Sequence, residues 1–270
     1  MIKIIINMNI NYYWINVNET TDRRNYMELQ FKVRGIKNKR IDGITPKDLP
    51  FILEDKPPFI CGYPDCIKNG CKDCPIEYSV VCSHLKAIKE AYENGDEFFI
   101  ICEDDIYFPF EIDINRLMIS IPPEIDIIQM MVISSGHTEL FYNNFYKNKN
   151  LFIKYSPIIP SAGFYIMRRN GAYKLLDKYI NKETGKFDLR NCNYLKLADV
   201  LIYQSCNTIV STFPFCYPNI NFKSQIHPDH YENHKDAYNM IKMKIKEDNL
   251  NHPLILKYYP CEDFEKLLTS

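Results

Sequence analysis

Two kinds of hydrophobic pattern alternate along most of the chain: short continuous apolar runs and helical repeats. The first run covers residues 12–17. The helix-capping residue types Thr20, Thr21 and Asp22 follow it, and apolar positions then recur at helical spacing as far as Val33. An apolar run followed by capping residues and a 3.6-residue period predicts a strand, a turn and a helix.

A second strand is predicted over residues 36–41, closed by the turn pair Asp42-Gly43. Residues 44–76 are rich in Pro and Cys and show no period, so we interpret them as an insertion or lid. A helix is predicted from Ser79 up to Gly95, a residue type that commonly ends helices. The apolar face of this helix contains Val81, Leu85, Ile88 and Tyr92.

Residues 98–102 form a continuous apolar run that ends at Glu103-Asp104-Asp105. Such runs are typical of central strands that are buried on both faces. Further strands are predicted over residues 125–133 and 163–167, and further helices over 172–180 and 198–204. This alternation predicts an α/β fold with a mostly parallel central sheet flanked by helices. Sheets of this kind bind ligands beyond the carboxyl ends of their strands, where the acidic triplet lies.

Composition and charge narrow the class of protein. The 270 residues contain 33 Lys and Arg against 34 Asp and Glu, so the net charge of −1 predicts no general attraction to nucleic acid. No apolar run reaches the ~20 residues of a membrane span or resembles a signal-peptide core. We therefore expect a soluble, cytoplasmic protein that folds as a single domain over residues 1–270.

The acidic triplet is the first candidate for chemistry. Hard divalent ions such as Mg²⁺ and Mn²⁺ prefer carboxylate oxygens, and an ion bound here can also bridge two phosphate oxygens. Three adjacent acids beside an apolar strand repel one another, and a bound cation relieves that repulsion. The alternative interpretation is an ordinary acidic turn in which Asp104 or Asp105 caps the next element.

The second candidate is a group of cysteines in the insertion. Cys61, Cys66, Cys71 and Cys74 have the spacing Cys-x4-Cys-x4-Cys-x2-Cys, and four thiolates can hold one structural Zn²⁺. Cys82 can replace one of these ligands. Two disulfides or unlinked thiols remain open alternatives.

Several segments resemble glycosyltransferase family 25, a family that includes lipopolysaccharide-type sugar transferases and collagen galactosyltransferase domains. Their order is that of the family. The matching segments are Trp14-Ile15-Asn16-Val17, Asp22-Arg23-Arg24, Asp42-Gly43, Ser83-His84, Cys102-Glu103-Asp104-Asp105-Ile106, Ser161-Ala162-Gly163-Phe164-Tyr165-Ile166 and Ala198-Asp199-Val200. The chain departs from the family's usual Gly-rich approach to Ser-His, and the cysteine segment also lies outside the pattern.

The resemblance implies a GT-A-like, Rossmann-type fold, a UDP-sugar donor and Mn²⁺ or Mg²⁺ as cofactor. It implies transfer of galactose, glucose or N-acetylglucosamine to a glycan or a protein acceptor of the hydroxylysine type, with inversion at the anomeric carbon. We expect the acceptor to bind near the cysteine segment. The sequence selects neither the sugar nor the acceptor, and it gives no oligomeric state.

Site roles follow from these expectations. We assign the metal to Glu103 and Asp105, with Asp105 as the first choice. We assign Asn16 and Asp104 to binding of the UDP-sugar donor. Arg23 and Arg24 can pair with its phosphates, although both can equally be surface charges on a first helical turn.

The catalytic base is assigned to Asp199, because inversion needs a carboxylate that takes the acceptor proton. The alternative role of Asp199 is to cap a helix. Glu139 and Asp126 are weaker candidates for the base.

Three histidines are secondary candidates. His227 and His230 lie late in the chain and can add a metal ligand, with a solvated loop as the alternative. His84 is assigned to the donor pocket, with a structural role in the core as the alternative.

Three functions are therefore compared. The first is an active UDP-sugar transferase, and the second is a zinc-stabilised binding protein that has the fold but no activity. The third is a phosphotransferase built on the acid cluster. The absence of a Gly-x4-Gly-Lys phosphate loop disfavours the third.

Overall fold

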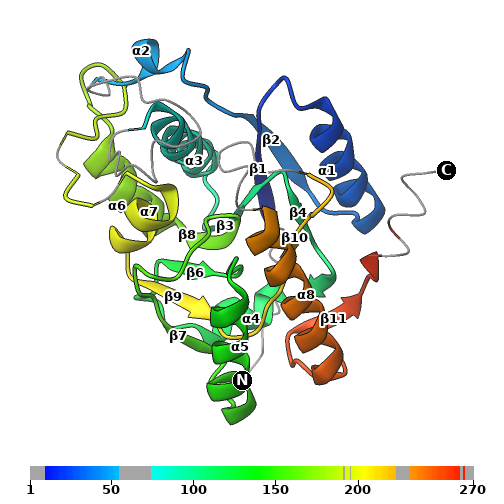
Figure 1. Ribbon diagram of the computed structural model, residues 1–270. Helices are drawn as coiled ribbons and strands as arrows, with labels where there is room; N and C mark the ends of the chain where they lie inside the picture. Colours follow the sequence, from blue (N-terminus) through cyan, green and yellow to red (C-terminus); the bar gives the residue numbers. More distant parts are fainter. Residues whose placement is uncertain are drawn as a thin grey trace.

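A seven-stranded sheet forms the centre of the protein (Figure 1). The computed structural model describes residues 10–54, 74–190, 192–194, 196–222, 231–261 and 264. The strand order is β2-β1-β3-β8-β6-β9-β7. In chain order the strands are β1 (Asn11–Asn16), β2 (Asn38–Asp42), β3 (Phe98–Glu103), β6 (Ile127–Gln129), β7 (Phe152–Lys154), β8 (Phe164–Arg168) and β9 (Thr208–Ser211).

The sheet is mostly parallel, as predicted. β1 pairs in parallel with β2 and β3, and β6 pairs in parallel with β9. β8 runs antiparallel to both β3 and β6, and β7 runs antiparallel to β9. All strands except β7 and β8 therefore point in one direction, which is the arrangement expected of a Rossmann-like GT-A fold.

The central strands are buried on both faces, as the continuous apolar runs predicted. Along β3, Phe99 and Ile101 pack into one core cluster, whereas Ile100 and Cys102 pack into another. Successive side chains of a strand point to opposite faces, so one short run supplies both cores.

Helices cover the two faces separately. α2 (Leu49–Ile52), α3 (Pro75–Glu93), α6 (Arg169–Tyr179) and α7 (Ala198–Gln204) bury their apolar residues in the cluster of Phe99. α1 (Thr21–Arg34), α4 (Ile114–Ser120), α5 (Ser135–Asn144) and α8 (Tyr231–Asp248) contribute to the cluster of Ile100. Figure 1 shows α3, α6 and α7 gathered on their side, and α3 contacts both of the others.

Two small sheets and a short helix complete the described part. β4 (Ile106–Tyr107) pairs with β10 (Tyr217–Pro218), and β5 (Phe110–Ile112) pairs with β11 (Ile255–Tyr258). η1 (Tyr146–Asn148) follows α5. Because β4 starts just after the acidic triplet, its pairing with β10 brings Pro218 close to that triplet.

Element boundaries differ from the sequence predictions in several places. The helix predicted from Ser79 begins at Pro75, and Gly95 takes a φ of +81° just after its end, as its position predicted. The strand predicted over 125–133 is confined to Ile127–Gln129, and the insertion contains the short helix α2. Neither α8 nor the small sheets were predicted. No helix in the described ranges is long and apolar enough to cross a membrane.

Candidate active site

An open cavity of about 740 Å³ lies at the carboxyl edge of the sheet. β1 and β3 end there, and because β8 is antiparallel to β3, its first residues lie at the same edge. The starts of α3, α7 and α8 close the remaining sides, so segments far apart in the sequence meet in one cleft. Among the predicted site residues, Asn16, Arg23, His84, Glu103, Asp104, Asp105 and Asp199 line it.

Asp104 is held by protein groups on both of its carboxylate oxygens. Arg23 donates from Nη1 to Oδ1 at 2.7 Å, and Asn16 donates from Nδ2 to Oδ2 at 2.7 Å. The side chains of Arg23 and Asp104 are only 8% and 10% exposed. Asp104 therefore joins the first helix to the end of β3, and it also lines the cleft, where its contact with a donor stays a prediction.

Asp105 is bound less completely. Its Oδ2 lies 3.3 Å from Arg23 Nη1, and its side chain is 23% exposed. Burial raises the pKa of Asp105 to about 7; Arg23 lowers this pKa, whereas the Glu103 and Asp104 charges raise it. A carboxylate in this position is poorly compensated, so an added cation would stabilise its charged form.

Glu103 belongs to a chain of hydrogen bonds that reaches into the core. His84 Nε2 lies 3.3 Å from Glu103 Oε1, and His84 Nδ1 lies 3.1 Å from the Tyr165 hydroxyl. His84 and Tyr165 are fully buried, whereas the Glu103 side chain is 30% exposed. Only the Glu103 end of this chain is open to a ligand.

Asp199 lies across the cleft on the first turn of α7. Its Oδ2 accepts the backbone N–H of Ser161 at 3.0 Å, and its Oδ1 accepts the N–H of Val200 at 2.8 Å. Burial raises the pKa of Asp199, although these two N–H groups lower it. A raised pKa suits a group that must accept a proton near neutral pH.

Ser161 adopts a backbone conformation that side chains rarely take, with a φ of +95°. Four contacts hold it there. Its N–H donates to Asp199, its carbonyl accepts from Tyr203 and Gln129, and its Oγ accepts the N–H of Gly163. Strain of this kind persists where surrounding contacts fix it, and such positions cluster at functional sites.

The charge of the cleft favours a bound cation. The carboxylates of Glu77, Glu103, Asp104, Asp105 and Asp199 line it, and among the described lining residues Arg23 alone carries a guanidinium. No three described His, Cys, Asp or Glu side chains are grouped as a complete metal site. Mg²⁺ and Mn²⁺ do not need one, because they bind through one or two carboxylates together with phosphate and water oxygens.

Arg24 contacts two asparagines, Asn16 and Asn18. It donates to Asn16 Oδ1 at 3.3 Å and to the Asn18 carbonyl at 2.7 Å, and it does not line the cleft. Arg40 also donates to Asn16 Oδ1, at 2.9 Å, from the neighbouring strand β2. Arg24 thus helps to fix Asn16, whose amide in turn holds Asp104, and its predicted contact with the donor stays a prediction.

The alternative base candidates lie elsewhere. Asp126 is buried and accepts from Lys174 Nζ at 2.6 Å and from Asn170 Nδ2 at 3.1 Å. Glu139 is an exposed residue of α5. Neither residue lines the cleft, so of the three carboxylates considered for the base only Asp199 remains in place.

Several predicted ligands lie outside the described residues. These are His227 and His230, together with Cys61, Cys66 and Cys71. Cys74 lies within the described residues. It directly precedes α3, is buried and does not line the cleft. The zinc hypothesis remains a prediction.

The structure adds residues that the sequence did not single out. Glu77 from α3, Ser161 and His234 from α8 all line the cleft. His234 follows the predicted His227 and His230 by seven and four residues in the sequence, and nothing in the local sequence pattern distinguishes the three. Ser161 was part of a recognised segment, but its positive φ has no signature in the sequence.

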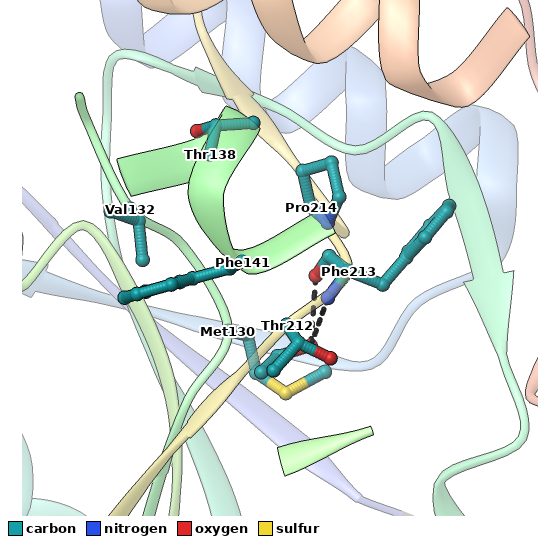
Figure 2. A pocket seen from close by; sticks show the side chains of 8 residues that line it. Met130, Val132, Thr138, Phe141, Thr212, Phe213 and Pro214 are labelled. Carbon is teal, nitrogen blue, oxygen red and sulfur yellow. Dashed lines mark hydrogen bonds between the residues drawn. The ribbon is translucent and has the colours of Figure 1, made fainter. Parts of the chain in front are cut away.

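A second cavity is too small for a substrate. In Figure 2 the side chains of Met130, Phe141 and Phe213 surround it, and its volume of about 10 Å³ corresponds to roughly one water molecule. Ser211 Oγ donates to the Phe213 carbonyl at 2.8 Å beside it. This cavity is a packing gap between α5 and the loop after β9.

Comparison with known proteins identifies a family for this chain. The family model described as "Glycosyltransferase family 25 (LPS biosynthesis protein)" matches residues 9–188. No curated protein sequence matches the chain. Among solved structures, A197 from STIV is similar at 10% identity and a TM-score of 0.42, over 82% of this chain and 91% of that one. Mouse xyloside xylosyltransferase 1 is similar at 12% identity and a TM-score of 0.26, over 59% of this chain and 53% of that one.

Proposed function

The chain belongs to glycosyltransferase family 25, and from this premise we propose that it transfers a hexose from a UDP-sugar to a hydroxyl of a glycan or hydroxylysine-type acceptor. One observation carries the proposal. A single cleft at the carboxyl edge of the sheet holds the acidic group of β3 and, across from it, the carboxylate of Asp199. The groups that we assign to the donor and to proton transfer thus line the same cleft.

We assign a divalent ion, Mn²⁺ or Mg²⁺, to Asp105. Both oxygens of Asp104 are bound by Arg23 and Asn16 at 2.7 Å, whereas the Asp105 side chain has a longer contact to Arg23, at 3.3 Å, and is 23% exposed. When bound, the ion would supply Lewis-acid stabilisation of the UDP leaving group. Arg23, fixed by Asp104, places a positive charge beside the same phosphates.

We assign the base to Asp199. The backbone N–H groups of Ser161 and Val200 fix the direction of its carboxylate, and burial raises its pKa. The acceptor hydroxyl gives its proton to this carboxylate as its oxygen attacks the anomeric carbon, and UDP leaves from the opposite side. Transfer by this route inverts the anomeric configuration.

The test is UDP release and sugar transfer by the purified protein across a panel of UDP-sugars, with and without Mn²⁺. Asp199→Asn and Asp105→Asn are compared with Glu139→Gln, a matched change at an exposed acid outside the cleft. We expect Mn²⁺-dependent release that selects one sugar, a loss of 10²-fold or more in both cleft variants, and wild-type rates in Glu139→Gln.

Two results would contradict the proposal. Tight UDP binding without turnover of any sugar would support the inactive binding protein instead. Full activity of Asp199→Asn would assign the base to another group.

A further inference from the structure

The chain Tyr165–His84–Glu103 suggests a more specific role for the end of β3. His84 lies on the face of α3 that packs against the sheet, and its ring stacks on Tyr165 with centroids 5.8 Å apart at 27°. None of its surface is exposed, so a donor cannot be held mainly by His84 itself. Any effect of His84 on a ligand passes through Glu103.

The two partners of His84 are matched by one tautomer of its ring. In the tautomer with the proton on Nε2, His84 donates to Glu103 Oε1 in their 3.3 Å contact. His84 Nδ1 then has a free lone pair, which accepts the Tyr165 hydroxyl at 3.1 Å. Burial raises the pKa of Tyr165 well above its ordinary value, so this hydroxyl keeps its proton.

Glu103 consequently has one oxygen bound and one available. Oε1 is held by His84, whereas Oε2 accepts no hydrogen bond from the described residues. Oε2 lies beside Gly163, where an added Cβ would come within 3.5 Å of it and within 3.0 Å of Met131 Sδ. The glycine lets this segment pack closely against Met131 and Glu103, and Glu103 itself lines the cleft, where a ligand can reach it.

The position of Glu103 separates its role from that of Asp105. The backbone N–H of Glu103 donates to the Gly163 carbonyl, and the segment of Gly163 is the one that Asp199 holds through Ser161. Asp105, by contrast, shares Arg23 with Asp104. In the proposed reaction the transferred sugar must lie between the phosphates, at Arg23 and Asp105, and the acceptor hydroxyl, at Asp199. Glu103 lines the same cleft, and its charge acts on both Asp105 and Asp199, so it lies near both groups.

We infer that Glu103 accepts hydrogen bonds from hydroxyls of the transferred sugar and that His84 is a positioning residue which holds the Glu103 carboxylate in the required orientation. This inference rests on the proposed function. It removes Glu103 from the set of metal ligands and makes it a determinant of sugar specificity. A site built to bind a hydroxyl rejects an epimer that places the hydroxyl elsewhere, because the carboxylate is then left unpaired.

The experiment measures UDP binding and UDP-sugar turnover separately, each with Mn²⁺. The variants are Glu103→Gln, His84→Leu and His84→Gln, whose amide can restore a donor to Glu103. For His84→Leu we expect kcat/KM for the preferred UDP-sugar to fall roughly 10–100-fold, while the affinity for UDP alone stays within about twofold. His84→Gln should recover part of the loss, and Glu103→Gln should lose the preference between UDP-glucose and UDP-galactose.

Three outcomes would overturn the inference. If UDP affinity falls as much as turnover in His84→Leu and in Glu103→Gln, Glu103 belongs to the phosphate and metal site. If the preference between the two sugars is unchanged in Glu103→Gln, another group binds the sugar hydroxyls. If the wild-type protein turns over no UDP-sugar at all, the proposed function fails first and this inference fails with it. Thermal unfolding of each variant shows whether the fold is retained.

Discussion

Asp104 and Asp105 are neighbours in sequence, but the structure gives them different environments. Asp104 has its two oxygens bound to Arg23 and Asn16, each at 2.7 Å, whereas Asp105 lies farther from Arg23, at 3.3 Å. A triplet of acids after an apolar strand predicts their place at the cleft, but it cannot show which acid is used internally. That choice depends on Arg23 and Asn16, which arrive from a different strand and helix.

Substitutions of the two acids should differ in their effect on the stability of the fold. We expect Asp104→Ala to lower the free energy of unfolding by about 3 kcal/mol or more, because it leaves the Arg23 charge buried without its nearest partner. Asp105→Asn should cost less, because it removes like-charge repulsion and breaks only the longer contact. Urea denaturation of both variants checks this difference. Equal losses would mean that Arg23 depends on the two acids equally.

Ser161 provides a test of backbone strain at the cleft. Ser161→Gly and Ser161→Ala both remove the Oγ that accepts from Gly163, but only glycine takes a φ of +95° without strain. We expect the glycine variant to be more stable than the alanine variant by about 1 kcal/mol. Thermal unfolding of the pair measures this difference directly, since the lost hydrogen bond cancels. An alanine variant as stable as the glycine variant would show that no strain is stored there.

At the scale of elements, the sequence predicted the strands and helices that carry the strongest patterns. Residues 98–102 were recognised because β3 is buried on both faces and has no polar position before Glu103. β8 was also recognised, but its antiparallel direction was not, because an apolar run has the same composition in either direction. This direction matters, since it brings Ser161 and Gly163 to the edge where Glu103 ends.

α8 was missed for a related reason. Its buried residues are Ala237, Ile241, Lys244 and Ile245, so one position of its buried stripe is a lysine, and most of its other residues are polar or charged. A pattern this weak does not predict an 18-residue helix. Missing α8 also meant missing His234, which α8 brings to the cleft.

The segment after α8 predicts a pH dependence of stability. His252 packs against Tyr146, Phe213 and Phe215, with ring centroids between 4.7 and 5.4 Å away. Its Nδ1 accepts the N–H of Leu254 at 3.2 Å, so the folded protein needs the neutral ring. Burial lowers the pKa of His252 to about 3 from the ordinary 6.5.

Because this pKa is lowered on folding, the unfolded chain binds a proton at His252 between pH 6.5 and pH 3 and the folded protein does not. The stabilising contribution is complete above pH 6.5 and is lost as the pH falls. From this residue we expect about 2 kcal/mol of lost stability between pH 7 and pH 5. His252→Phe keeps an aromatic ring but cannot titrate, so its unfolding free energy should depend less on pH by that amount. Identical pH profiles for the two proteins would exclude this role for His252.

At the scale of the whole molecule, the cleft has an excess of negative charge, and the diphosphate of the proposed donor adds to it. Five carboxylates line the cleft: Glu103 at the end of β3, Asp104 and Asp105 directly after it, Glu77 on α3 and Asp199 on α7. Among the described lining residues, Arg23 carries the one guanidinium. The net charge of −1 for the chain gave no sign of this, because the charges cancel elsewhere on the surface. A diphosphate that enters alone meets mainly like charge.

Binding of UDP and of Mn²⁺ should therefore be strongly coupled. We expect Mn²⁺ to increase the affinity for UDP by roughly 5–150-fold, which corresponds to a coupling of about 1–3 kcal/mol. Linkage requires UDP to increase the affinity for Mn²⁺ by the same factor. Calorimetric titration of each ligand with and without the other measures both factors.

Uridine is the matched control for this coupling, because it has the base and ribose but no phosphate. If the ion acts by neutralising the diphosphate against the carboxylates, uridine affinity should not change with Mn²⁺, and Asp105→Asn should remove the coupling for UDP. If uridine shows the same coupling, the ion instead orders the cleft as a whole. If UDP binds equally well with and without Mn²⁺, Arg23 alone is enough for the diphosphate, and the acids of β3 serve the sugar and the fold.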